Sequence, residues 1–157
     1  MNINETQVDS VDMTLLGRLA RDGRATWTSL AAELGLTPPA VAARVRRLVR
    51  IGVIRQFAAV IDPPAMGAVT AFVDVVFAHA EGHDHFRQSM AHLVAVQDCH
   101  RVAGAAHYRL KVRTRSKEEL EMLLNSALPK AAPQAAFHVS MVLSVVKESP
   151  VFPLPRG

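Results

Sequence analysis

The fold is decided by the stretch from Leu30 to Ile54, which reads LAAELGLTPPAVAARVRRLVRIGVI. Gly35 follows an apolar helical stripe, and glycine readily takes the left-handed conformation that ends a helix. Thr37 is a good N-cap, and the proline after it fits the first helical position. The stretch therefore predicts two short helices joined by a tight turn, and the second helix begins at about Thr37.

The second of these helices has two different faces. Val41, Val45 and Leu48 recur at helical spacing, so they share one face and pack on the preceding helices. The opposite face has small residues near the start of the helix and arginines behind them. Small residues let the backbone approach base edges, and arginines reach phosphates or guanine. We predict that DNA contacts Thr37, Pro39, Ala40, Ala43, Arg44, Arg46, Arg47 and Arg50.

The main alternative is that this arginine face is only solvated, as most charge runs are. The four arginines between positions 44 and 50 have no acid among them, so no ion pair within the helix offsets their repulsion. This uncompensated charge favours an anionic partner. The net charge of the whole chain also favours an anionic partner, because its 157 residues carry a formal net charge of +4.

Composition narrows the class of protein further. Hydrophobic residues make up 50% of the chain, which is enough for a substantial core. Cys99 is the single cysteine, which excludes an intrachain disulfide and fits a reducing compartment. The sequence contains neither a signal-peptide pattern nor an apolar run of membrane-spanning length. We therefore expect a soluble, cytoplasmic protein with no membrane partner.

The chain is predicted to divide into four segments. Residues 11–22 repeat apolar side chains at helical spacing, which adds a third helix to the first domain. The β-rich run 53–61 ends at Asp62 and two prolines, which mark a boundary. The predicted segments are a winged-type helix-turn-helix domain at 1–54, a linker strand or hinge at 55–66, a second domain at 67–148 and an extended C-terminal tail at 149–157.

The second domain alternates strands and helices. Its order, βαββαβ, is typical of a ferredoxin-like α+β fold, in which both helices cover one face of a four-stranded antiparallel sheet. The other face would be exposed in a monomer, and the last strand is very apolar, so we expect dimerisation through the sheet. The predicted strands are 68–79, 94–103, 107–114 and 136–147, and the predicted helices are 83–93 and 117–128.

Separated motifs along the chain match one known family. In the first domain they include Asp22-Gly23-Arg24, Gly35-Leu36-Thr37 and Gly52-Val53-Ile54, and in the second they include Gly104, Tyr108 and Val146-Lys147. On these residues the chain resembles the Lrp/AsnC (feast/famine) transcription regulators along nearly its whole length. The resemblance implies a helix-turn-helix domain followed by a RAM or ACT-like domain of ferredoxin-like fold.

The resemblance also implies partners and a second site. Family members are homodimers, often assembled into octamers, that bind double-stranded DNA and respond to an amino acid or related metabolite. Residues 67–148 would then be the ligand-sensing and dimerisation domain. The implied small-molecule effector lies between dimers, near the turn that joins the two middle strands, which here contains Ala103, Gly104, Ala105, Ala106, His107 and Tyr108.

This turn departs from the family pattern. Family members commonly have Gly-Asp-aromatic-Asp-Tyr, whereas this chain has Gly104-Ala105-Ala106-His107-Tyr108. A buried ammonium group needs an anionic or carbonyl partner, because an unpaired buried charge is costly. The site is therefore open to a less cationic or more apolar metabolite, to an acid bound by His107 and Arg109, or to no ligand.

One enzyme alternative stays open. Siroheme decarboxylases resemble this family and use histidines in the C-terminal half, so His107, Tyr108 and Arg109 would be the first residues to test in that case. The intact arginine-bearing helix favours a regulator, and we expect no enzymatic activity and no cofactor. Metal ligands could come from His79, Glu81, His83 and His85, but their spacing matches no established site, so no metal is expected.

Overall fold

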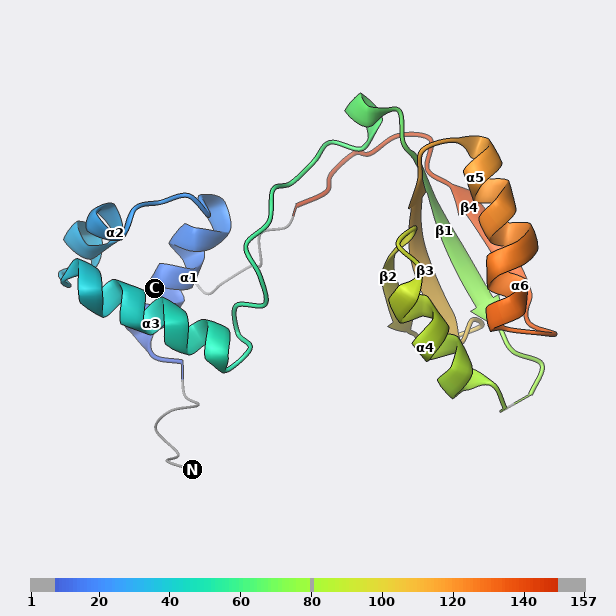
Figure 1. Ribbon diagram of the computed structural model, residues 1–157, viewed down its shortest axis with the longest axis horizontal. Helices are drawn as coiled ribbons and strands as arrows, with labels where there is room; N and C mark the ends of the chain where they lie inside the picture. The colour runs from blue at the N-terminus through green and yellow to red at the C-terminus, as the bar shows by residue number, and fades with distance from the viewer. Residues whose placement is uncertain (1–7, 80, 150–157) are drawn as a thin grey trace. The chain divides into compact units, whose positions relative to one another are not determined.

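The computed structural model describes residues 8–79 and 81–149 (Figure 1). The chain divides into two compact units. Of the described residues, the first unit holds 8–60 together with 147–149, and the second holds 61–79 and 81–146. Each unit has a hydrophobic core of its own.

The described residues of the first unit form three helices. They are α1 (Ser10–Arg21), α2 (Trp27–Leu34) and α3 (Pro38–Arg50). Gly35 ends α2 with a φ of 65°, and the Thr37 hydroxyl accepts a hydrogen bond from the Ala40 N–H at 3.4 Å. Both predicted boundaries of the tight turn are therefore confirmed.

The apolar stripes of the three helices meet in one core. Val41, Val45 and Leu48 are buried, which confirms the predicted inner face of α3. Burial of a large aliphatic side chain contributes roughly 1.5–3 kcal/mol, so this face fixes which side of α3 points outward. The same core contains Leu15, Leu19, Leu30 and Ala31.

The segment that follows α3 differs from its prediction. Residues 55–62 form neither helix nor strand, so the strand expected at 53–61 is not present. A β-strand needs a hydrogen-bonded neighbour, and the described strands pair only with one another in a single sheet. A short 3-10 turn at Pro64–Met66 then leads into the second unit.

The second unit has the predicted βαββαβ order. Its four strands form an antiparallel sheet in the order β2-β3-β1-β4, as the ferredoxin-like prediction requires. Among the described residues no helix is long and apolar enough to cross a membrane. The elements are β1 (Val69–Val76), α4 (His83–His92), β2 (Val96–Arg101), β3 (Tyr108–Thr114), α5 (Lys117–Met122), a π-helical segment (Leu123–Ala127), α6 (Leu128–Ala131) and β4 (Ala136–Met141).

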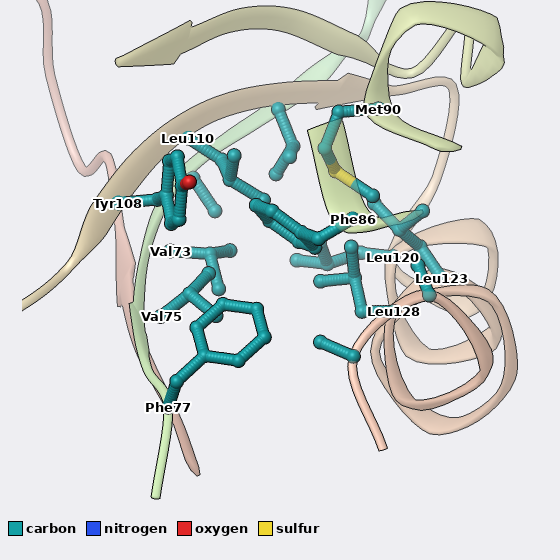
Figure 2. Close-up of a cluster of buried hydrophobic side chains, with 14 residues drawn as sticks. Val73, Val75, Phe77, Phe86, Met90, Tyr108, Leu110, Leu120, Leu123 and Leu128 are labelled. Carbon is teal, nitrogen blue, oxygen red and sulfur yellow. The ribbon is translucent and has the colours of Figure 1, made fainter. Parts of the chain in front are cut away.

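Helices α4, α5 and α6 cover one face of this sheet (Figure 1). The two central strands, β1 and β3, supply the sheet side of the core, and Phe86 and Met90 of α4 pack onto it (Figure 2). The other helices add Leu120, Leu123 and Leu128 to the same cluster. The core therefore lies between the sheet and the helices, and it reaches the turn before β3 through the buried Tyr108.

The opposite face of the sheet is less apolar than predicted. Strand β4 ends at Met141 rather than at 147, and its Val139 lies opposite Val73, on the side of the helices. On the open face Asp74 of β1 lies opposite Arg109 of β3, and the two form an ion pair. The apolar side chains of β4 are thus exposed mainly because β4 is an edge strand.

Candidate functional site

The outward side of α3 is the first candidate site, and its eight predicted DNA-contacting residues differ in exposure. The side chains of Arg44 and Arg47 are only 30% and 21% exposed. Ala40 is half-buried, and the exposed residues are Thr37, Pro39, Ala43, Arg46 and Arg50. Arg44 and Arg47 are therefore less exposed to solvent than Arg46 and Arg50.

Two acids at the start of α1 hold these two arginines. Nη1 of Arg44 lies 2.6 Å from Oδ2 of Asp9 and 2.8 Å from Oδ1 of Asp12. Nη2 of Arg47 pairs with Oδ2 of Asp12. The Asp12 side chain is fully buried, so its charge requires these cationic partners. We call Asp9, Asp12, Arg44 and Arg47 the arginine–aspartate cluster.

The same two acids cap α1. Oδ1 of Asp9 accepts a hydrogen bond from the Asp12 N–H at 2.7 Å, and Oδ2 of Asp12 accepts one from the Asp9 N–H at 3.1 Å. The Asp12 N–H and the guanidinium of Arg44 lower the pKa of Asp9. The hydrogen bond to Asp9 in turn raises the pKa of Arg44. The arginine–aspartate cluster therefore joins the beginning of α1 to α3.

This cluster corrects one inference from the sequence. The spacing within α3 predicts four uncompensated arginines, but acids 32 and 35 residues earlier compensate Arg44 and Arg47. The pattern within one helix cannot show a partner so distant. The available signal lies in α1, where Asp12 shares the buried face with Leu15 and Leu19. An acid on a buried face requires a nearby cation.

The turn between β2 and β3 is the second candidate site. Gly104 has a φ of 138°, which side-chain-bearing residues rarely adopt. Tyr108 is only 1% exposed and belongs to the core of the second unit (Figure 2). Of the other predicted effector residues, Ala106 is half-buried and the exposed ones are Ala103, Gly104, Ala105 and His107.

Two histidines lie beside Tyr108. Nδ1 of His107 accepts a hydrogen bond from the Phe77 backbone N–H at 2.9 Å. Nδ1 of His83, at the start of α4, lies 3.1 Å from the Tyr108 hydroxyl oxygen. The His83 ring stacks on Phe77 with centroids 4.3 Å apart, and its centroid lies 5.6 Å from that of His107. The structure thus adds His83 to the predicted turn, where the sequence suggests only a metal ligand.

Arg109, the other predicted partner for an acidic ligand, is bound to Asp74. Its Nε and Nη2 lie 2.7 and 2.8 Å from the two carboxylate oxygens of Asp74. This bidentate arrangement is the strong geometry for an arginine–carboxylate pair, and it lowers the pKa of Asp74. The guanidinium of Arg109 is therefore bound to Asp74 of β1, although the side chain is 56% exposed. His107 is the exposed acid-binding candidate within the turn itself.

The histidine-rich segment around the start of α4 contains the residues that the sequence suggests as metal ligands. Among the residues that the structure describes, no three His, Cys, Asp or Glu side chains come together as a metal site. His83 instead contacts the aromatic rings of Phe77 and Tyr108.

Each of the two units matches a domain of a known protein family. Residues 8–49 match the AsnC-type helix-turn-helix domain, and residues 70–152 match the Lrp/AsnC ligand binding domain. The HTH-type transcriptional regulator LrpA of Mycobacterium tuberculosis is 40% identical over 118 residues, which cover 74% of this chain and 79% of that protein. LrpC of Bacillus subtilis is 31% identical over 134 residues, which cover 85% of this chain and 91% of that protein.

Solved structures agree with these matches. The crystal structure of M. tuberculosis LrpA has a TM-score of 0.83 at 33% identity, covering 94% of this chain and 99% of that one. A feast or famine regulatory protein from M. tuberculosis complexed with L-methionine has a TM-score of 0.82 at 34% identity, with coverage of 90% and 96%. A helix-turn-helix domain joined to a ligand-binding domain defines a class of DNA-binding transcription regulators. The chain belongs to the Lrp/AsnC family of these regulators, as its sequence motifs predict.

Proposed function

We propose that this protein binds double-stranded DNA through the outward side of α3 and that an effector in the second unit modulates the binding. The observation that carries the proposal is the exposure of Arg46 and Arg50 on the helix that matches an AsnC-type helix-turn-helix domain. Exposed arginines bind phosphates, and neutralising phosphates supplies much of the affinity of such proteins for DNA.

The eight residues of the proposed interface have two roles. Thr37, Pro39, Ala40 and Ala43 allow close approach at the start of α3, and Arg46 and Arg50 contact phosphates or base edges. Arg44 and Arg47 are mainly positioning residues, because Asp9 and Asp12 already bind their guanidinium groups. A guanidinium has five N–H donors, so an arginine in an ion pair can also donate a hydrogen bond to a phosphate.

The proposed binding unit is a homodimer. Two copies of α3 then enter successive major grooves, with half-sites spaced by about one helical turn or a multiple of it. Val139 is 41% exposed and Met141 is 45% exposed on the edge strand β4, and such apolar surface supports association between copies. Assembly of dimers into octamers, as the family resemblance implies, is part of the proposal.

The proposed effector site is the turn that contains Ala103, Gly104, Ala105, Ala106, His107 and Tyr108. Support comes from the match of the second unit to a ligand binding domain and from the relative that was crystallised with L-methionine. Tyr108 contributes from within the core, and the other five residues lie toward the surface. The effector regulates only if it binds one assembly or DNA-bound state better than another.

We propose that the protein is a cytoplasmic regulator and not an enzyme. The relatives named above are transcription regulators, which favours this function over a siroheme decarboxylase. The exposed arginines of α3 also fit a DNA-binding role and have no part in the decarboxylase alternative. Regulation of transcription requires access to the chromosome, and this requirement supports the proposed cytoplasmic location.

Binding to two matched duplexes tests the proposal. One is a fragment that flanks the protein's own gene, and the other is a shuffled duplex of the same length and composition. Fluorescence anisotropy at several salt concentrations is expected to show tighter binding of the flanking fragment and a steep loss of affinity with salt. Equal, salt-independent affinities for the two duplexes would contradict sequence-specific binding by α3.

A further inference from the structure

The side chain of His107 has a fixed hydrogen-bond polarity. Its Nδ1 accepts a hydrogen bond from the Phe77 N–H at 2.9 Å, so the proton of the neutral ring is on Nε2. Because His107 is an exposed residue, this Nε2–H is a donor at the surface of the turn. A protonated ring nitrogen has no free lone pair, so the site is suited to an oxygen acceptor and not to a metal ion.

The ring of His83 lies beside the ring of His107, which carries this donor. The His83 ring is held between its contact with the Tyr108 hydroxyl and its stacking on Phe77. Figure 2 shows Tyr108 and Phe77 on the same side of the core, and both are buried. The two imidazole rings lie nearly perpendicular at an interplanar angle of 88°, and the hydrogen bond from the Phe77 N–H positions His107 beside His83.

The turn supplies no acidic side chain to balance a cationic ligand. None of the residues from 102 to 108 is Asp or Glu. On the neighbouring elements, Asp74 of β1 pairs with Arg109, and Asp84 of α4 pairs with Arg87. The other acids there are Glu81 in the loop before α4 and Asp98 of β2. An ammonium group at the turn therefore meets no carboxylate among residues 102–108, whereas a carbonyl or carboxylate oxygen there meets the His107 donor.

Building on the proposed effector site, we infer that this regulator responds to an organic acid without an amino group, of the 2-oxo acid class. The Nε2–H of His107 donates a hydrogen bond to an oxygen of this ligand. An oxo group in place of the amino group removes the cation that the turn cannot balance and adds an acceptor. His107 is therefore the residue that determines specificity between 2-oxo acids and amino acids.

Matched pairs of ligands test this inference. L-Methionine and 4-methylthio-2-oxobutanoate differ only at the second carbon atom, and L-leucine and 4-methyl-2-oxopentanoate form a second such pair. Calorimetric titration of the full chain is expected to show about tenfold or more tighter binding of a 2-oxo acid than of its amino acid. The two ligands differ by one hydrogen bond to a strongly polar group, and a bond of this kind changes affinity by about that factor.

Two variants of His107 separate its ligand contact from its structural contact. His107→Asn keeps an acceptor for the Phe77 N–H but lacks Nε2, so it is expected to lose about tenfold or more in 2-oxo acid affinity. His107→Asp supplies an acidic acceptor, so its preference is expected to shift toward the amino acid. His92→Gln, at the far end of α4, is the matched control and is expected to behave as the wild type.

Three outcomes overturn the inference. They are tighter binding of the amino acids by the wild type, an unchanged preference in His107→Asp, and binding of no member of either pair. DNA binding by the same proteins is measured separately. A wild type that binds DNA but fails the ligand test overturns the inference alone, whereas a wild type that fails to bind DNA overturns the proposed function.

Discussion

The guanidinium of Arg47 forms an ion pair with Asp12, a fully buried carboxylate that lies 35 residues earlier in the chain. Asp12 also belongs to the capping box that starts α1. One buried charge thus supports the start of α1 and faces the helix proposed to bind DNA. The orientation of α3 within the first unit therefore depends on this charge pair as well as on the apolar core.

Removal of both arginines from the arginine–aspartate cluster is expected to destabilise the first unit by about 3–5 kcal/mol. In the Arg44→Ala/Arg47→Ala variant, the Asp12 carboxylate stays buried without either cation. Urea unfolding monitored by the fluorescence of Trp27 measures this effect. Trp27 is the chain's one tryptophan and lies in α2, so its signal reports on the first unit.

The control for that variant is the addition of Asp12→Asn. An amide costs less to bury than an unpaired charge, so the triple variant is expected to regain part of the lost stability. A triple variant that is less stable than the double variant would show that charge burial is not the cause of the loss.

Acid is expected to weaken the first unit through Asp9. Its hydrogen bond from the Asp12 N–H and the Arg44 guanidinium lower its pKa below the usual value of 3.8. A carboxyl group with a lowered pKa in the folded state stabilises the fold above the unfolded pKa. This contribution is lost as the pH falls from about 3.8 through the lowered value. Asp9 is 48% exposed, so solvent screening keeps the effect small.

The measurement is urea unfolding of the wild type and Asp9→Asn at pH 5.5 and at about pH 3, again followed by Trp27. The wild type is expected to lose more stability than Asp9→Asn between the two pH values. Parallel losses in the two proteins would mean that Asp9 contributes nothing to the acid sensitivity.

The turn between α2 and α3 gives a separate prediction about the backbone. Gly35→Ala is expected to cost about 1–2 kcal/mol, because Gly35 has a φ of 65° that favours glycine. No atom lies within 4 Å of the added Cβ, so the cost is conformational and not steric. Gly23→Ala is the matched control, since its Cβ would make ordinary contacts at 3.8 Å. Thermal unfolding that affects both variants equally would refute this explanation.

Local signals in the sequence predicted the elements well. Gly35 and Thr37 define the turn between α2 and α3 because capping depends on neighbouring residues alone. Alternating and helical periodicities were sufficient for the βαββαβ order and the ferredoxin-like fold. These features depend on interactions within a few residues, which is why a single sequence reveals them.

Contacts between distant residues were not predicted. The pairing of Arg47 with Asp12 and that of Arg109 with Asp74 each join residues 35 positions apart. The strand expected at 53–61 failed for a related reason, because β-propensity does not show whether a neighbouring strand is present. At the candidate effector turn, His107 is a prediction from the sequence, whereas the contact of His83 with Tyr108 became visible only in the fold.

The most direct test of DNA binding by α3 is the salt dependence of its affinity, compared among the wild type, Arg46→Ala/Arg50→Ala and Arg87→Ala. Arg87 is an exposed arginine of the second unit and serves as the control. If Arg46 and Arg50 contact phosphates, a dimer of the double variant loses two contacts from each of its two copies of α3. The slope of log K against log salt then falls by about 4 in the double variant and stays unchanged in Arg87→Ala. Equal slopes in all three proteins would contradict DNA binding through the outward side of α3.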